Sequence, residues 1–186
     1  MKKILVFASG NGSNAQKIFE HFQKSNSIKV AGLFCNNPTA GVVEKASKFN
    51  ISVTLFTKEA LHSGDVLRYL NEIQPELIIL SGFLLRIPEH IVKSFPNKIV
   101  NIHPSLLPKY GGKGMYGMKV HQAVLDNKES ETGITIHFVN EHYDEGAILF
   151  QAKTNIVDCL TTGAIAAKVQ SLEHEYFPQT IENLLS

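Results

Sequence analysis

Residues 4–14 read ILVFASGNGSN, an unbroken apolar run that passes directly into a loop with two glycines. A strand covered on both faces has a continuous apolar sequence, so Ile4–Ala8 is expected to lie inside a parallel sheet. The loop Ser9–Asn14 precedes a stripe of apolar residues at helical spacing. The stripe consists of Ala15, Ile18, Phe19 and Phe22. This start predicts a strand, a tight loop and a helix, which together begin a β-α-β unit.

The same alternation of strand and helix continues to residue 102. Strands separated by helices predict a parallel sheet with right-handed crossovers. The helix expected over residues 61–73 contains Ser63-Gly64, where an interruption is expected. The expected strands cover residues 28–35, 51–56, 77–80 and 98–102, and the other expected helices cover residues 41–49 and 88–94.

The pattern changes after residue 130. Residues 132–139 alternate between apolar and more polar side chains, as a strand with two different faces does. Residues 147–153 form a second expected strand, and Asn140–Gly146 connects the two. A short connection of this kind predicts an antiparallel hairpin that extends the sheet.

The C-terminal stretch, residues 162–185, predicts a helix that Pro178 should kink or divide. No internal repeat, low-complexity segment or linker interrupts the sequence. At 186 residues, 44% of them hydrophobic, the chain is expected to form one α/β domain over residues 1–186.

The amino-acid composition limits the kinds of molecule that the protein is expected to bind. The net charge of +1 gives no long-range attraction to nucleic acid or to a membrane surface. The eight histidines are scattered without a metal-ligand spacing, so no metal site is expected. Cys35 and Cys159 lie far apart and are typical of reduced thiols in a cytosol. The apolar run that Gly10 ends is too short for a signal peptide, so a cytoplasmic protein is expected.

The loop Ser9–Asn14 is a candidate anion site, because it joins a strand to the N-terminus of a helix. Backbone N–H groups and the helix dipole favour a phosphate there. The loop lacks the lysine of a Walker motif and does not match G-x-G-x-x-G, so a single phosphate is favoured over a dinucleotide. The alternative is a tight turn with Ser13 or Asn14 as the helix N-cap.

A second candidate site is the segment Asn101-Ile102-His103-Pro104-Ser105-Leu106-Leu107-Pro108, at the end of an expected strand. The period of two places the side chains of Asn101 and His103 on the same side. An amide can donate to a developing oxyanion, and an imidazole can move a proton near neutral pH. The pair therefore suggests acyl-group chemistry without a Ser or Cys nucleophile. The alternative is a structural asparagine and a buried histidine of the core.

Three further segments carry functional and structural readings that the residues alone leave open. Tyr143–Gly146 places a carboxylate between two strands, or is an ordinary turn. Gln170 and Glu173 share one face of the last helix, where they bind a ligand or are merely solvated. Leu80–Pro88 is an apolar loop that would wrap a flat aromatic ligand or pack a strand against a helix.

With these motifs together, the chain resembles the phosphoribosylglycinamide formyltransferase family, folate-dependent enzymes of purine synthesis. The resemblance covers nearly the whole chain and rests on the order and spacing of five segments. The Asn-x-His-Pro-Ser-Leu-Leu-Pro segment is shared with other folate formyl-transfer enzymes, and the Gly-Asn-Gly-Ser-Asn loop points to the glycinamide enzyme. The segments are Gly10–Asn14, Ser81–Leu84, Asn101–Tyr110, Thr132–Asp144 and Val169–Pro178.

The resemblance implies a doubly wound sheet with an antiparallel C-terminal hairpin. It also implies transfer of a formyl group from 10-formyltetrahydrofolate to the amine of glycinamide ribonucleotide, without a metal. The oxygen of a tetrahedral intermediate would be stabilised by Asn101 and His103, with Asp144 assisting. The ribonucleotide would contact Gly12, Ser13, Asn14, Gln170 and Glu173. The folate would contact Lys58, Leu84, Leu85, Arg86, Ile87, Asn101, Asn140, Glu141, His142, Tyr143 and Asp144.

Two features depart from the family pattern. Leu85 stands where the family has an arginine, and Arg86 follows it. The glycine-rich stretch Tyr110–Met118 is longer than the family's, and we expect part of it, Gly111–Met118, to be a mobile loop at the mouth of the site. The sequence does not decide between a monomer and a homodimer.

Three alternative functions stay open at this level. A formyltetrahydrofolate hydrolase would use the same site with water as acceptor, and is expected to carry an additional N-terminal domain. A methionyl-tRNA formyltransferase would need a further C-terminal domain and a basic surface. A non-catalytic nucleotide-binding module would keep His103 and Asp144 as structural residues.

Overall fold

The computed structural model describes residues 1–186, which fall into two compact units. Unit 1 comprises residues 1–100 with Leu185 and Ser186, and unit 2 comprises residues 101–184. Seven strands form one sheet in the order β3-β2-β1-β4-β5-β6-β7. Strand β5, Ile99–His103, contributes its first two residues to unit 1 and its last three to unit 2.

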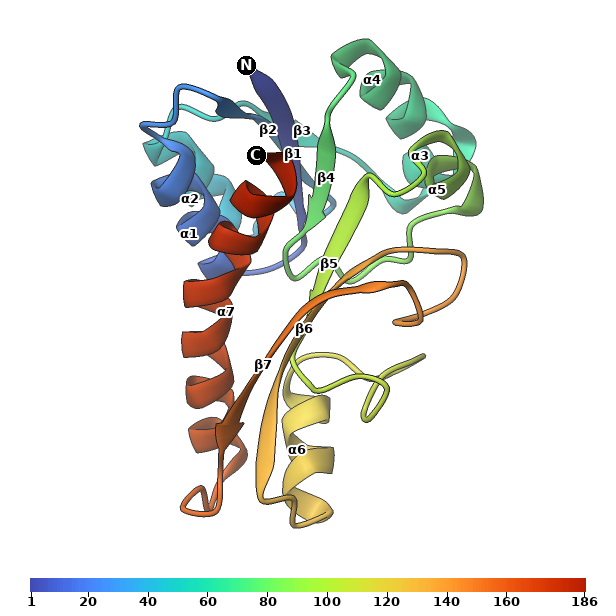
Figure 1. Cartoon of the computed structure of the whole chain (residues 1–186). Helices are drawn as coiled ribbons and strands as arrows, with labels where there is room; N and C mark the ends of the chain where they lie inside the picture. The colour runs from blue at the N-terminus through green and yellow to red at the C-terminus, as the bar shows by residue number, and fades with distance from the viewer. The chain divides into compact units, whose positions relative to one another are not determined.

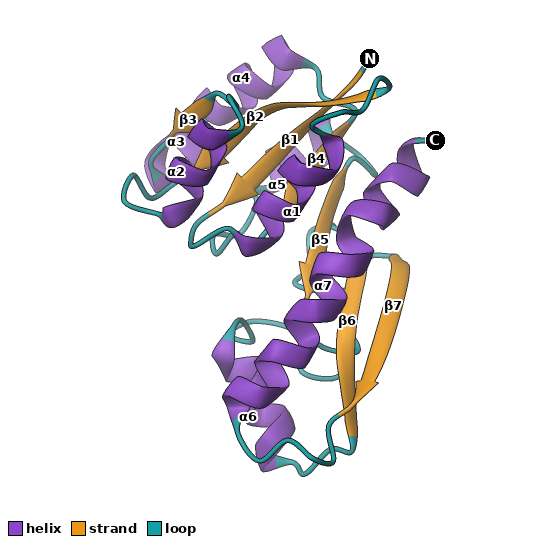
Figure 2. Ribbon diagram, turned by 90° about the vertical axis from the view of Figure 1, so that its left-hand side faces the viewer, coloured by secondary structure: helices purple, strands orange, loops and turns teal.

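Unit 1 is built from alternating strands and helices. Strand β1 pairs in parallel with both β2 and β4, and β2 pairs in parallel with β3. Helices α1 and α2 lie on one face of these strands and α3, α4 and α5 on the other (Figures 1 and 2). The elements are β1 (Lys2–Ala8), α1 (Ser13–Phe22), β2 (Ile28–Cys35), α2 (Gly41–Lys48), β3 (Val53–Leu55), α3 (Lys58–Ser63), α4 (Asp65–Ile73), β4 (Leu77–Leu80) and α5 (Glu89–Ser94).

The core of unit 1 forms around the central strand β1. Every residue of Ile4–Ala8 is fully buried, as the unbroken apolar run predicts. Phe7 stacks on Phe34 with ring centroids 4.9 Å apart and meets Phe83 edge-on. Burying one such side chain stabilises the fold by about 1.5–3 kcal/mol. This packing holds the loops at the carboxyl end of β1 on a rigid strand.

Two element boundaries in unit 1 have local causes. Gly64, with φ of 98°, ends α3 and precedes α4, so the interruption predicted at this point is confirmed. The strand expected over residues 51–56 is shorter than predicted, because the Ile51 N–H is still bonded to the Ala46 carbonyl at the end of α2. Pairing with β2 begins only at Val53.

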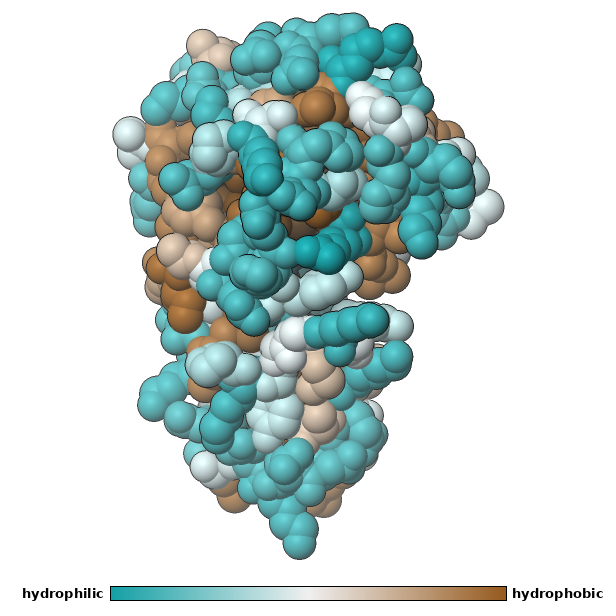
Figure 3. All heavy atoms as spheres, turned by 90° about the vertical axis from the view of Figure 1, so that its right-hand side faces the viewer, coloured by the Kyte–Doolittle hydropathy of each residue, from teal (hydrophilic) through white to brown (hydrophobic).

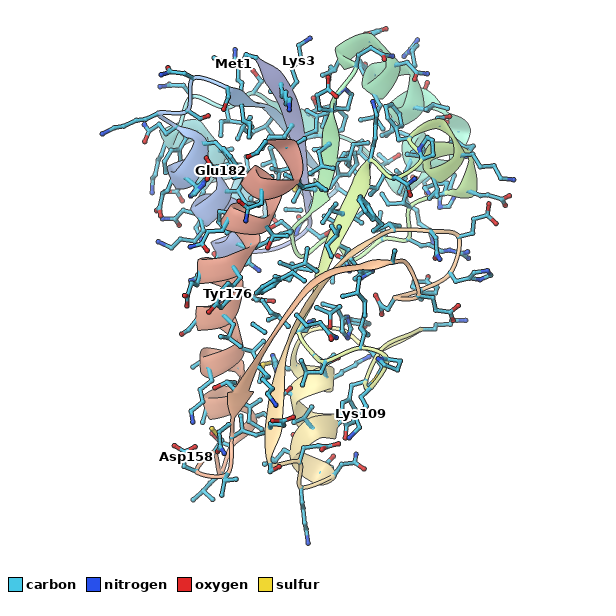
Figure 4. All side chains as sticks on the ribbon, in the orientation of Figure 1. Met1, Lys3, Lys109, Asp158, Tyr176 and Glu182 are labelled. Atoms are coloured by element: carbon cyan, nitrogen blue, oxygen red, sulfur yellow. The ribbon has the colours of Figure 1, made fainter.

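Unit 2 contains a pair of antiparallel strands and two helices. In the pair β6–β7, Thr135 lies opposite Gln151. Helix α7 runs beside this pair in Figure 1, and Tyr176 on α7 contacts Phe150 on β7 with ring centroids 4.9 Å apart (Figure 4). The elements are the end of β5, α6 (Met118–Asp126), β6 (Glu131–Phe138), β7 (Ile148–Asn155) and α7 (Thr162–Leu185), whose last residue belongs to unit 1.

The predicted fold class is confirmed: the sheet is mostly parallel, with an antiparallel C-terminal strand pair. The expectation of one domain over residues 1–186 stays a prediction. The expected division of the last helix at Pro178 is wrong, because α7 is continuous. A proline inside a helix costs about 3 kcal/mol, and the burial of Phe177, Pro178 and Ile181 offsets that cost.

Helix α6 was not among the elements predicted from the sequence. It begins at Met118, directly after the glycine-rich stretch, and buries Val120, His121 and Val124.

No helix has the length and apolar character needed to cross a membrane. The face drawn in Figure 3 is covered mainly by hydrophilic residues.

Candidate active site

The candidate active site begins at the end of β5, where Asn101 and His103 lie two residues apart. His103 is 4% exposed. Its Nε2 atom lies 2.8 Å from the carbonyl oxygen of Tyr110, and its Nδ1 atom lies 3.6 Å from Oδ2 of Asp144. An N–H at Nε2 therefore donates to the backbone, while Nδ1 faces a carboxylate.

Asp144 lies in the connection between β6 and β7, with a left-handed φ of 55°. Its Oδ2 accepts a hydrogen bond of 2.9 Å from the Gly112 N–H, and its side chain is only 14% exposed. Its Oδ1 lies 3.6 Å from Nε2 of His137. Asp144 is thus held against two buried imidazoles, which an ordinary solvated turn residue is not.

His137 on β6 joins the cluster, although the sequence did not single it out as a site residue. Its Nδ1 donates to the Phe138 carbonyl at 2.8 Å, so its Nε2 is the acceptor for the Asn101 amide at 3.2 Å. Burial lowers the pKa of His137 below its ordinary value, which favours this neutral form, although the Phe138 carbonyl and Asp144 act in the opposite direction. The only signal was weak, because a histidine on the more polar face of β6, opposite Ile134 and Ile136, fits the alternating pattern.

The cluster is suited to acyl-group chemistry. His137 fixes one N–H of the Asn101 amide, and the other N–H can donate to a developing oxyanion. The carboxylate of Asp144 stabilises positive charge on His103. Neither Ser nor Cys is among the four side chains, so the arrangement provides an acid–base and oxyanion site rather than a covalent nucleophile.

The turn that follows His103 is braced by buried polar contacts. Thr135, fully buried on β6, accepts from the Leu107 N–H at 2.9 Å and donates to the Ser105 carbonyl at 2.7 Å. Gln151 on β7 donates to both Thr135 Oγ1 and the Leu107 carbonyl, at 2.8 and 3.1 Å. These bonds hold the backbone of the turn that directly follows His103.

In unit 1, the glycine loop has the geometry of a backbone anion site. Helix α1 begins at Ser13, and its N-cap is Gly12 with φ of 72° and no side-chain cap. The alternative in which Ser13 or Asn14 is the N-cap is therefore wrong. A Cβ atom at Gly12 would overlap the side chain of Val42, and φ is left-handed as well, so glycine is required at this position.

The residues expected to contact folate fall in different places. In unit 1, the segment Leu84–Ile87 is tied to β1, because Ser9 Oγ accepts from the Leu84 N–H at 3.0 Å. Leu84 is 63% exposed and Ile87 is buried. Lys58 is the first residue of α3. In unit 2, Asn140 caps a turn by accepting from the His142 N–H at 2.9 Å.

Of the remaining predicted residues, Leu85 and Arg86 lie within the loop after β4 in unit 1. Glu141 and Tyr143 lie in unit 2 between β6 and β7, where Tyr143 is 43% exposed. Gln170 and Glu173 lie on α7, Gln170 exposed and Glu173 half-buried. The structure thus brings together Asn101, His103 and Asp144 and adds His137, while the binding roles of the other residues stay predictions.

Comparison with known proteins identifies the family to which this chain belongs. A formyl transferase family model matches residues 2–181, so the chain belongs to the formyl transferase family. Within that family the chain is similar to proteins named phosphoribosylglycinamide formyltransferase. The phosphoribosylglycinamide formyltransferase of Bacillus subtilis is 35% identical to this chain. The match covers all of this chain and 95% of the relative's length.

Two further relatives carry related names. The chloroplastic phosphoribosylglycinamide formyltransferase of Vigna unguiculata is 39% identical over 98% of this chain, which spans 61% of that relative's length. The crystal structure of glycinamide ribonucleotide transformylase 1 from Geobacillus kaustophilus matches with a TM-score of 0.91 at 33% identity. That match covers the full length of both chains.

Proposed function

We propose that this protein transfers the formyl group of 10-formyltetrahydrofolate to the amine of glycinamide ribonucleotide, a step of de novo purine synthesis. The observation that carries the proposal is the buried cluster of Asn101, His103, His137 and Asp144 at the end of β5. The names of the relatives support the choice of acceptor. Both substrates are small molecules, and the chemistry requires no metal.

The reaction begins when the amine attacks the formyl carbon and the formyl oxygen becomes negative. The Asn101 N–H that His137 leaves unused donates to this oxygen. Protonated His103 adds positive charge, which Asp144 stabilises at 3.6 Å. The tetrahedral intermediate collapses when the folate nitrogen leaves.

We assign the proton transfer between the two substrates to His103 and Asp144. The amine must lose a proton and the departing folate nitrogen must gain one. Nδ1 of His103 is the ring atom for this exchange, because Nε2 is held by the Tyr110 carbonyl. A water held by Asp144 can complete the relay between the two nitrogens.

Binding is assigned to the segments that the resemblance indicated. The phosphate is proposed to bind the backbone N–H groups of Gly12–Asn14, where α1 has no side-chain cap. Gln170 and Glu173 are proposed to contact the rest of the ribonucleotide. The folate is proposed to bind Lys58, Leu84–Ile87 and Asn140–Asp144.

The test is an assay of the purified protein with 10-formyltetrahydrofolate, with and without glycinamide ribonucleotide. Formyl consumption that requires the ribonucleotide and yields its formylated product supports the proposal. Consumption that is independent of the ribonucleotide shows a hydrolase. Formylation of methionyl-tRNA shows a tRNA-modifying enzyme, and binding of the ribonucleotide without turnover shows a nucleotide-binding module.

A further inference from the structure

Glu129, in the turn between α6 and β6, makes two charge-assisted contacts with the loop that follows β5. Its Oε1 accepts from the Tyr110 hydroxyl at 2.8 Å and from Lys109 Nζ at 2.8 Å. Figure 4 labels Lys109 on this loop. The two donors lower the pKa of Glu129, whose side chain is 24% exposed, so the carboxylate is charged at neutral pH. Glu129 therefore anchors Tyr110 by its side chain.

The backbone of the same loop contacts the candidate catalytic residues. The Tyr110 carbonyl accepts from Nε2 of His103, and the Gly112 N–H donates to Asp144. Tyr110 has a left-handed φ of 56°, a conformation that residues other than glycine adopt only when their surroundings enforce it. The contact with Glu129 supplies such enforcement, together with the bond from Ser105 Oγ to the Lys109 carbonyl.

We propose that Glu129 is a positioning residue that acts on His103 through Tyr110. The carboxylate holds the tyrosine, the tyrosine holds its own carbonyl in place, and this carbonyl holds the proton of His103 on Nε2. Nδ1 then faces Asp144 and is the ring atom available for proton transfer. The inference rests on the proposed function only for the identity of the reaction.

The main consequence is a loss of turnover without a matching loss of binding. If the carbonyl is displaced, the His103 proton is no longer confined to Nε2 and the ring can turn away from Asp144. Displacement of a catalytic group by about 1 Å can cost about 100-fold in rate. We expect Glu129→Ala and Tyr110→Phe each to lower kcat by roughly 10- to 100-fold, with KM changed much less.

Matched variants separate this role from general stabilisation. Glu129→Gln keeps an acceptor for the Tyr110 hydroxyl and should recover most of the turnover that Glu129→Ala loses. Lys109→Met removes the second donor but leaves the tyrosine contact intact, so its effect should be small. Because Glu129 and Tyr110 act in one chain of contacts, the double variant Tyr110→Phe/Glu129→Ala should lose no more than the stronger single variant.

A measurement that needs no turnover follows the His103 ring directly. Nitrogen NMR of the imidazoles in the ligand-free protein reports which ring nitrogen carries the proton. We expect the Nε2–H form in the wild-type protein and in Lys109→Met, and a mixture of both forms in Glu129→Ala and Tyr110→Phe. His137, which holds its proton on Nδ1 through Phe138, is the internal reference.

The proposal is overturned if the His103 signals are the same in Glu129→Ala as in the wild type. It is also overturned if kcat falls only in proportion to the fraction of unfolded protein, measured by urea denaturation of each variant. If the wild type transfers no formyl group while the His103 tautomer still depends on Glu129, the proposed function fails and the positioning role stands.

Discussion

The loop after β1 and the turn after β5 both follow strands of the sheet, yet the two candidate sites are built differently. At Gly12 the site is backbone: the N-cap has no side-chain bond, and a Cβ would strike Val42. At His103 the site is a network of side chains whose partners come from other elements of unit 2. A backbone site is encoded locally by glycine, whereas a side-chain cluster depends on how distant segments pack.

The largest loss of turnover is expected when the side chain of His103 is removed. His103→Ala removes the imidazole and should lower kcat by roughly 10²–10⁴-fold, the usual effect of a positioned acid–base group. KM for both substrates should change far less. Steady-state kinetics give both constants, and His62→Ala, a helix residue outside the site, is the control. Turnover near the wild-type level would show that the cluster is structural.

Asp144→Asn should have the next largest effect on turnover. The neutral amide keeps the shape but removes the charge that favours protonated His103 at 3.6 Å. Turnover should therefore fall by roughly 10²-fold, while KM for both substrates changes far less. Steady-state kinetics of both proteins measure this. Turnover near the wild-type level in Asp144→Asn would show that Asp144 is only a turn residue.

The backbone site is tested by a pair of glycine substitutions. Gly12→Ala forces a Cβ against Val42 at a left-handed φ, while Gly10→Ala meets nothing within 4 Å. Gly12→Ala should weaken ribonucleotide binding by roughly tenfold and leave folate binding nearly unchanged, because the backbone donors shift. Gly10→Ala should affect neither, which calorimetry and urea denaturation of both variants will measure. Equal loss of both ligands in Gly12→Ala argues against a phosphate site.

The smallest expected effect concerns stability and pH. Burial lowers the pKa values of His121 and His137 below 6.5, and the charge of His103 contributes in both cases. Their neutral forms stabilise the fold fully above pH 6.5, and this stability is lost as the pH falls towards the lowered pKa values. Each histidine contributes a slope of at most about 1.4 kcal/mol per pH unit.

His121→Phe should flatten that dependence, because it removes one buried titrating ring. Urea denaturation at about pH 5.5 and about pH 7.5 gives the free energy of unfolding at each pH, and the difference gives its slope against pH. The exposed variant His62→Ala should behave like the wild type. A slope unchanged in His121→Phe would show that this ring does not contribute.

Local patterns were sufficient for much of the fold. The buried run Ile4–Ala8, the break at Gly64 and the strand Leu77–Leu80 all lie where the sequence predicted them. Helix α6 was missed because it starts directly after a glycine-rich stretch, although Val120 and Val124 lie at helical spacing and are buried. The division expected at Pro178 did not occur, because the burial of Pro178 and its neighbours offsets the hydrogen bond that a proline cannot make.

Only part of the candidate site could be predicted from the residues themselves. Asn101 and His103 are neighbours on one strand, so the period of two was enough to place them together. Asp144 stood in a segment whose residues alone favoured an ordinary turn, and its place in the cluster was expected from the family resemblance alone. His137 gave only a weak signal within an alternating strand.

The chain's local sequence is enough to specify the parallel strands, the glycine loop and the strand-end pair, because each depends on residues a few positions apart. Tertiary structure alone brings His137 to Asn101 and Asp144 to Gly112, pairs separated by 36 and 32 residues. It also brings the Asp144 carboxylate to within 3.6 Å of both His103 and His137. Such contacts follow from the packing of whole elements, whose positions no local propensity encodes.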